Sequence, residues 1–167
     1  KTTYSIFDGA YNDPLECLDR NYQCVFAGVY STYYWQNTSW YNVITEPFDL
    51  PEHEQPHFHW YRNLVKLFTE HYDYNQLAPA QNAFSAPMLT DGEDLYLFYI
   101  PEKRRGIFGA LPELKGKVMK VRWYDPLDGS FLSDGERDFS GGTWMQITRP
   151  ADFDSPIGIV VLEAVDP

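Results

Sequence analysis

The sequence predicts a mixed fold, in which residues 1–80 supply strand–helix units of a parallel sheet and residues 81–167 form a small antiparallel β-sandwich. Three observations lead to this prediction. Strand-like and helix-like hydrophobic patterns alternate in the first half, as they do in parallel α/β proteins. From about residue 81 the pattern changes to short strand-like runs separated by glycine-containing turns. A hydrophobic share of 44% is also ample for a buried core.

The first unit is expected to be a strand, a helix and a second strand. Thr2–Phe7 and Val29–Trp35 have the β-branched and aromatic bias of strands. Between them, Asp13 lies where an N-cap is expected, Pro14 is at the first helical position, and Glu16 completes a capping box. The expected buried face, at helical spacing, is Leu15, Leu18, Tyr22, Val25 and Phe26.

A second helix is expected from Pro56 to about His71, after a proline-rich surface loop. Its predicted buried stripe is Trp60, Leu64, Leu67, Phe68 and His71. Two strand–helix units make too small a parallel sheet to be stable alone. We therefore expect the first half to be completed by another part of the polypeptide or by a companion chain, joined to the second half through residues 72–82.

The second half contains six predicted strands. They are Ala83–Leu89, Leu95–Ile100, Val118–Tyr124, Ser130–Leu132, Thr143–Thr148 and Ile157–Val165. The predicted turns between them contain Asp91-Gly92, Asp125–Gly129, Asp134-Gly135 and Gly141-Gly142. The strand at 118–124 alternates cleanly, with Met119, Val121 and Trp123 on one face and Lys120, Arg122 and Tyr124 on the other.

Composition excludes several classes of partner. A net charge of -11 disfavours nucleic acid, whose binding depends on clustered lysine and arginine. No apolar run approaches the roughly 18 residues of a membrane helix, so no membrane partner is expected. The first residues are too short and polar for a signal peptide, and there is no initiator methionine, so we expect a processed product or a fragment.

The two cysteines, Cys17 and Cys24, are expected to be free thiols. Seven residues separate them on the predicted helix. That spacing corresponds to about 10 Å along the axis, beyond the reach of a disulfide. Free thiols favour a reducing compartment, whereas Asn37-Thr38-Ser39 is a glycosylation sequon and favours a secreted one. The compartment stays open.

The stretch Gly28–Trp40 is the strongest candidate for ligand contact. Tyrosine and tryptophan rings alternate there with polar groups, and no acidic or basic residue interrupts them. Aromatic faces stack on the C–H face of a sugar ring, while amides and hydroxyls bind its hydroxyl groups. The alternative is a buried strand and turn whose rings fill a core.

No metal site or cofactor is expected. His53, His57 and His59 lie near Glu52 and Glu54, which could suggest a zinc site. However, the last two histidines are two residues apart, so on a helix they would point about 200° apart. Motifs for phosphate binding, CxxC chemistry or a serine nucleophile elbow are absent from the sequence. The basic triplet at 103–105 is interpreted as a solvated loop or as charge facing an acidic neighbour.

Four segments carry a resemblance to a known group. They are Ile6-Phe7-Asp8-Gly9-Ala10-Tyr11, the stretch Gly28–Trp40, the helix ending in Leu67-Phe68, and Trp123-Tyr124-Asp125-Pro126-Leu127-Asp128-Gly129. In this order they resemble the C-terminal end of glycoside-hydrolase-like proteins that join a (β/α)8 barrel to a C-terminal β-sandwich. The group includes barrel proteins related to apiosidases, whose terminal domain is described as collagen-binding.

The resemblance implies that residues 1–80 are the last two strand–helix units of the barrel and that residues 81–167 are the appended sandwich. Barrel active sites lie at the carboxyl ends of the strands. Asp8 stands where related retaining glycosidases carry the nucleophile at the end of the seventh strand, although the family pattern prefers the longer glutamate. The alternative is a loop aspartate that binds backbone amides.

The resemblance also implies a carbohydrate ligand and an extracytoplasmic or secreted protein. The expected sugar-contacting residues, each of which also fits a packing role, are Tyr11, Tyr33, Trp35, Gln36, Asn37 and Trp40. The acid/base carboxylate, from the fourth strand, would lie outside this sequence. Residues 1–167 alone are therefore expected to be inert even if the intact protein cleaves a glycosidic bond.

Two other function classes remain open. The chain could be a non-catalytic module that binds a glycan without cleaving it. It could also be a structural subunit whose open sheet edges are completed by a partner chain.

Overall fold

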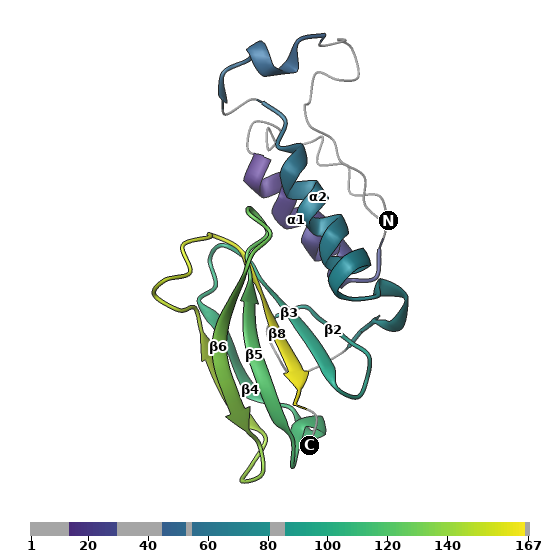
Figure 1. The fold of residues 1–167 in the computed structure, drawn as a ribbon, viewed down its shortest axis with the longest axis vertical. Coiled ribbons are helices and arrows are strands. Elements are labelled where there is room, and N and C mark those ends of the chain that lie inside the picture. Colours follow the sequence, from purple (N-terminus) through teal and green to yellow (C-terminus); the bar gives the residue numbers. More distant parts are fainter. Residues whose placement is uncertain (1–13, 30–44, 53–54, 81–85, 166–167) are drawn as a thin grey trace.

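The structure is a computed structural model that describes residues 14–29, 45–52, 55–80 and 86–165 (Figure 1). The predicted strand at Thr2–Phe7 and nearly all of that at Val29–Trp35 lie outside the described residues. The parallel, barrel-like part of the prediction therefore stays a prediction. Within the described ranges, the fold is two helices and a mostly antiparallel set of strands.

Helix α1 spans Pro14–Phe26 and begins at the proline, as predicted. Its buried residues are Cys17, Leu18, Tyr22 and Phe26, while Leu15 and Val25 are partly buried. The Glu16 carboxylate pairs with Arg20 at 2.5 Å, one turn along the helix. The N-cap at Asp13 lies outside the described residues, so the capping box is not tested. Cys17 and Cys24 are not joined in a disulfide, as predicted.

Helix α2 spans Phe58–Lys66 and continues as a π-helical turn over Leu67–His71. Of the predicted stripe, Leu67 and Phe68 are buried, and Trp60 and Leu64 are partly buried. His71 is exposed, so its place in the stripe was wrong. The wider π-helical turn rotates it away from the core. Its ring instead meets the ring of Phe131 edge-on, with the ring centres 5.1 Å apart.

The strands form two sheets. Six strands pair antiparallel in the order β1-β2-β3-β8-β5-β6, with bounds Ala78–Pro79, Met88–Thr90, Leu95–Ile100, Gly158–Ala164, Val118–Tyr124 and Phe131–Asp138. A separate pair is formed by β4, Gly106–Ala110, and β7, Trp144–Thr148. Short 3-10 turns cover Pro47–Asp49, Tyr74–Gln76 and Pro112–Leu114.

The six-stranded sheet has a core on each face. The face with Tyr96, Trp123 and Val160 packs against β4 and β7, which contribute Ile107 and Met145. The opposite face of the sheet packs against the helices. It contributes Leu97, Tyr124 and Val161, and the helical segment contributes Leu18, Tyr22, Phe26, Leu67 and Phe68. The alternation predicted for Val118–Tyr124 is confirmed, since residues 119, 121 and 123 lie in the first core and residue 124 in the second. The helices therefore lie on one side of the sheet and the two-stranded sheet on the other.

The strand predicted at Ser130–Leu132 is longer in the structure. Asp134-Gly135 was predicted to be a turn that ends it, but the strand continues through this pair. Strand β6 runs through it to Asp138. Arg122 pairs with Ser133 and Lys120 with Glu136, so two residues of β6 oppose one residue of β5. This is a β-bulge, and Gly135 takes the positive φ of 77° that such a position favours.

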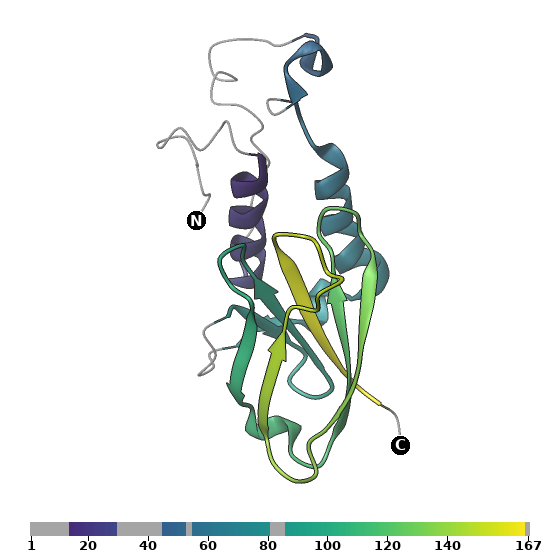
Figure 2. The same ribbon diagram turned by 90° about the vertical axis from the view of Figure 1, so that its left-hand side faces the viewer.

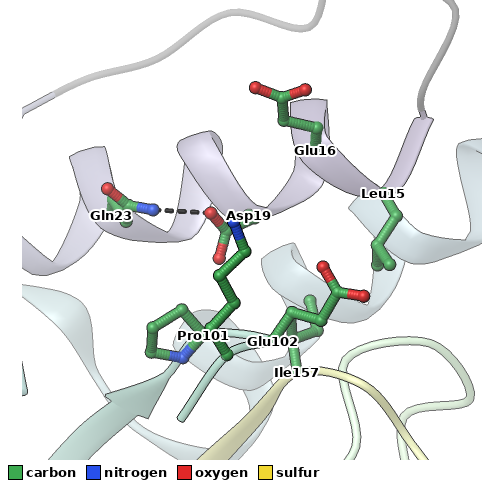
Figure 3. Close-up of a pocket in the computed structure, with 8 residues that line it drawn as sticks. Leu15, Glu16, Asp19, Gln23, Pro101, Glu102 and Ile157 are labelled. Carbon is green, nitrogen blue, oxygen red and sulfur yellow. Dashed lines mark hydrogen bonds between the residues drawn. The ribbon is translucent and has the colours of Figure 1, made fainter. Parts of the chain in front are cut away.

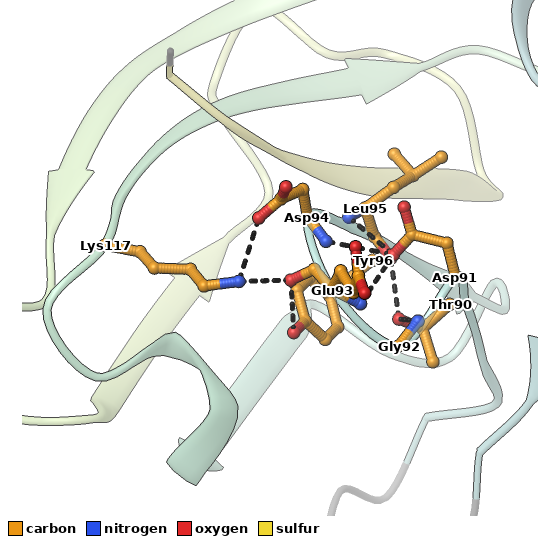
Figure 4. Close-up of polar contacts among 8 residues, drawn as sticks. All are labelled: Thr90, Asp91, Gly92, Glu93, Asp94, Leu95, Tyr96 and Lys117. Carbon is orange, nitrogen blue, oxygen red and sulfur yellow. Dashed lines mark hydrogen bonds and ion pairs between the residues drawn. The ribbon is translucent and has the colours of Figure 1, made fainter. Parts of the chain in front are cut away.

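The predicted Asp91-Gly92 turn is confirmed between β2 and β3 (Figure 4). One oxygen of Asp91 accepts hydrogen bonds from the backbone N–H groups of Glu93, Asp94 and Leu95, at 2.9, 3.0 and 3.0 Å. The ammonium group of Lys117, just before β5, donates to Asp94 at 2.9 Å and to the carbonyl of Glu93. These contacts hold the turn against the start of β5.

Candidate functional site

The predicted catalytic and sugar-contacting residues all lie outside the described part of the chain. They are Asp8, Tyr11, Tyr33, Trp35, Gln36, Asn37 and Trp40. Helix α1 begins six residues after Asp8 and ends at Phe26, and the described residues stop at Val29, inside the stretch Gly28–Trp40. The helix therefore separates the two candidate segments in sequence, and the structure places none of the candidate side chains.

A hollow of about 440 Å³ lies between α1 and the loop after β3 (Figure 3). Its lining residues are Leu15, Glu16, Asp19, Gln23, Pro101, Glu102, Lys103 and Ile157. Within this lining, the side-chain amide of Gln23 donates to the Asp19 carboxylate at 2.6 Å, one turn away on α1.

The Asp19 carboxylate also joins α1 to the sheet. The Tyr99 hydroxyl, from β3, donates to its second oxygen at 2.5 Å. Burial raises the pKa of Tyr99 far above its ordinary value, and the negative charge of Asp19 raises it further. The hydroxyl thus stays protonated and keeps donating. Because both oxygens of Asp19 already accept hydrogen bonds, we interpret it as a structural contact rather than as a catalytic base.

A second hollow, of about 320 Å³, lies beside β4 and β7. Its lining residues are Lys103, Arg104, Arg105, Gly106, Ile107, Phe108, Gln146 and Thr148. The ring of Phe108, which lines this hollow, is 64% exposed, and the ring of Trp144 on the neighbouring strand is 66% exposed. This surface was not predicted from the sequence, because Gly106–Ala110 was not recognised as a strand. An alternation of buried and exposed positions, with Ile107 buried and Phe108 exposed, is the pattern that could have indicated this strand.

The histidines form no metal site in the described ranges. No group of three or more His, Cys, Asp or Glu side chains there could hold an ion. The ring of His57 stacks on Trp60 at 4.0 Å, with the rings 9° from parallel. Burial, followed by the neighbouring His59, lowers the pKa of His57. His57 therefore acts as a neutral packing group at the start of α2. Nor is either described helix long and apolar enough to cross a membrane.

The fold is similar to part of two solved glycoside hydrolase structures. A crystal structure of a glycoside hydrolase family 5 protein from Bacteroides vulgatus ATCC 8482 matches with a TM-score of 0.66 and 17% sequence identity, over 90% of this chain and 36% of that one. A second structure, described as a glycoside hydrolase, matches with a TM-score of 0.65 and 14% identity, over 95% of this chain and 39% of that one.

No protein-family model and no curated protein matches the sequence. At these identities, the structural likeness concerns the fold alone. The chain spans less than two fifths of the length of the two solved proteins. The fold of this chain is therefore similar to one portion of each of these two larger structures.

Proposed function

We propose that this chain is the C-terminal portion of a (β/α)8-barrel glycoside hydrolase, with residues 1–80 closing the barrel and residues 81–167 forming the appended sandwich of the apiosidase-related group. The observation that carries the proposal is the coverage of the structural matches. Nearly all of this chain, 90% and 95%, superposes on little more than a third of two glycoside hydrolases.

An apolar surface on α2 supports the need for a missing part. Leu67 packs toward the sheet, and Val65, two residues earlier, points about 200° away from it. Val65 is 58% exposed, and Phe58, seven residues before it on the same side, is 53% exposed. A barrel helix has such a second apolar side, because it packs on barrel strands as well as on an appended domain.

In the intact protein, Asp8 would be the nucleophile of a retaining hydrolysis. Its carboxylate would attack the anomeric carbon, and a carboxylic acid outside this sequence would protonate the leaving oxygen. Water would then cleave the glycosyl–enzyme ester with the same outside residue as base. The residues at 11, 33, 35–37 and 40 would contact the sugar, and the isolated chain would be inert.

Replacing Asp8 in the intact protein tests this assignment. The Asp8→Asn variant should lose about a thousandfold or more in glycoside turnover. The matched control is Asp152→Asn, which changes an exposed aspartate in the loop between β7 and β8 and should leave turnover intact. In an Asp8→Gly variant, added azide should restore bond cleavage and give a glycosyl azide of inverted configuration. Unchanged turnover in Asp8→Asn would remove Asp8 from the mechanism.

The second candidate is a structural or binding module completed by a partner chain, which the exposed Phe58 and Val65 also fit. Both candidates require a further polypeptide, whereas a self-sufficient module does not. Measuring the mass of the purified 167-residue chain in solution distinguishes these cases. A stable, monodisperse monomer of 19.5 kDa would favour a stand-alone module, whereas self-association or instability would favour a missing remainder.

A further inference from the structure

The two-stranded sheet presents one side to the core and the other to solvent. Ile107, Met145 and Ile147 point inward and are almost completely buried. The outward side chains of the same strands are all exposed, and we call them the β4–β7 platform: Phe108, Ala110, Trp144, Gln146 and Thr148. Figure 2 shows this pair of strands in front of the larger sheet, on the near side of the molecule.

The register of the two strands brings the platform rings close together. Phe108 pairs with Gln146, and Ala110 pairs with Trp144. The two rings are therefore diagonal neighbours on one face, a relation that places residues about 7–8 Å apart. Ala110 opposite Trp144 is too small to cover the indole. The result is a shallow aromatic surface with an amide beside it, which suits the C–H faces and hydroxyls of successive sugar rings.

One end of the platform is positively charged. Three of the eight residues that line the adjoining hollow are Lys103, Arg104 and Arg105, and none is acidic. This is notable in a chain with 24 acidic and 13 basic residues. Because Lys103, Arg104 and Arg105 line the hollow, an anionic group there would meet positively charged hydrogen-bond donors.

The backbone holds the basic triplet in this place. The carbonyl of Arg105 accepts the N–H of Arg149 at 2.7 Å, and the N–H of Arg104 donates to Pro101 at 2.9 Å. At Gly106, an added Cβ would come within 2.0 Å of the Ile147 carbonyl oxygen. Only glycine therefore allows the backbone to lie this close to β7 where the basic triplet leads into β4. The position of the charges beside the rings is therefore built into the fold.

We propose that the β4–β7 platform binds a mostly neutral polysaccharide that carries occasional uronic acid residues, with neutral sugars on Trp144 and Phe108 and a uronate carboxylate at Arg104 and Arg105. The net charge of -11 disfavours a densely charged polymer such as nucleic acid, because most of the molecule would repel it. A sparsely charged glycan meets only the local positive group. This would be a second carbohydrate site, separate from the one proposed around Asp8.

Calorimetric titration of the full chain with two sparsely acidic probes tests the proposal. The probes are glucuronoxylan oligosaccharides and gum arabic fragments, each compared with the same material after its carboxyl groups are reduced to alcohols. The acidic form should bind about fivefold or more tightly than the reduced form at low salt, and the difference should shrink as salt is added. Polygalacturonate, with a carboxylate on every sugar, should bind more weakly than either acidic probe.

Two variants separate the roles of ring and charge. Trp144→Ala should weaken binding of both forms by about tenfold. Arg105→Gln should remove the preference for the acidic form and leave the reduced form unaffected. The matched controls are Phe48→Ala and Arg62→Gln, which change an exposed ring and an exposed guanidinium far from the platform in sequence and should bind like the parent chain.

Several outcomes would overturn the proposal: no binding of either acidic probe at millimolar concentration, tighter binding of polygalacturonate, or a Trp144→Ala variant that binds normally. If that variant loses its native circular dichroism, Phe108→Ala takes its place with the same expectation. Binding is measured without turnover, and the comparison of Trp144→Ala and Arg105→Gln with the parent chain makes no use of Asp8. Failure here and failure of the catalytic proposal are therefore distinguishable.

Discussion

Asn63 is the side chain that most directly fastens α2 to the sheet. It is buried on the helix, and its amide donates to the carbonyls of Pro126 and Leu127 at 3.3 and 3.0 Å. Both carbonyls belong to the turn between β5 and β6, more than sixty residues away in sequence. Asn63→Ala should therefore destabilise the fold without changing its core packing elsewhere.

The expected loss follows from these two hydrogen bonds. Each contributes about 1 kcal/mol net, and leaving a buried carbonyl unpaired costs about 1–3 kcal/mol. The 3.3 Å bond is long and counts for less than about 1 kcal/mol, so with about 1 kcal/mol for an unpaired carbonyl we expect a total loss of about 2–3 kcal/mol. For a chain of this length, the midpoint of thermal unfolding should fall by about 4–12 °C.

Urea unfolding, followed by tryptophan fluorescence, measures the change. The midpoint should fall while the slope stays constant, because the surface exposed on unfolding is the same. Asn75→Ala is the matched control, since that amide bonds only across an exposed turn to Asp73, and it should cost about 0.5 kcal/mol or less. A loss no greater in Asn63→Ala than in the control would refute the role assigned to this side chain.

Two further changes test how the helices are attached to the sheet, the first at the Asn63 junction and the second between α1 and β3. Gly129 has a φ of 82°, and an added Cβ would lie 2.9 Å from the Asn63 side-chain oxygen, so Gly129→Ala should cost about 1–3 kcal/mol in thermal unfolding. Gly141→Ala, with open space around it, should cost far less. Tyr99→Phe removes the hydrogen bond to Asp19 and should cost about 1–2 kcal/mol near pH 8. Because the folded-state pKa of Tyr99 lies above its ordinary value of 10.0, the native protein should lose stability as the pH rises above 10. Tyr99→Phe should lose less over that range, and an equal loss would contradict the assignment.

Strands were predictable where the side chains alternate and carry β-branched or aromatic residues. Val118–Tyr124 and Leu95–Ile100 have the predicted bounds because a sheet with a core on each face fixes which residues point where. The Asp134-Gly135 pair misled the prediction, since positive φ at glycine serves a bulge as well as a turn. The short, glycine-containing β4 has too little strand propensity of its own and is held by pairing with β7.

The candidate sites differ in how much of each could be predicted from the sequence. Asp8 was reached through the family resemblance and the aromatic stretch from its residue types; apart from Gly28 and Val29 they lie outside the described residues and stay predictions. The platform needed the fold, because Phe108 and Trp144 are 36 residues apart in sequence and become neighbours only through the β4–β7 register. Long-range pairing of this kind leaves no local signal.

The turn that carries the most specific part of the family resemblance turns out to be the junction with α2. The Tyr124 hydroxyl donates to the Asn63 carbonyl at 2.8 Å, while the Asn63 amide binds the carbonyls of the next turn residues. Glycine is needed at 129 because the same asparagine leaves no room for a side chain. In this chain, the Trp-Tyr-Asp-Pro-x-x-Gly turn therefore attaches the sheet to the helix, and none of its observed contacts calls for a sugar ligand. The proposed carbohydrate sites lie elsewhere, at Asp8 and on the β4–β7 platform.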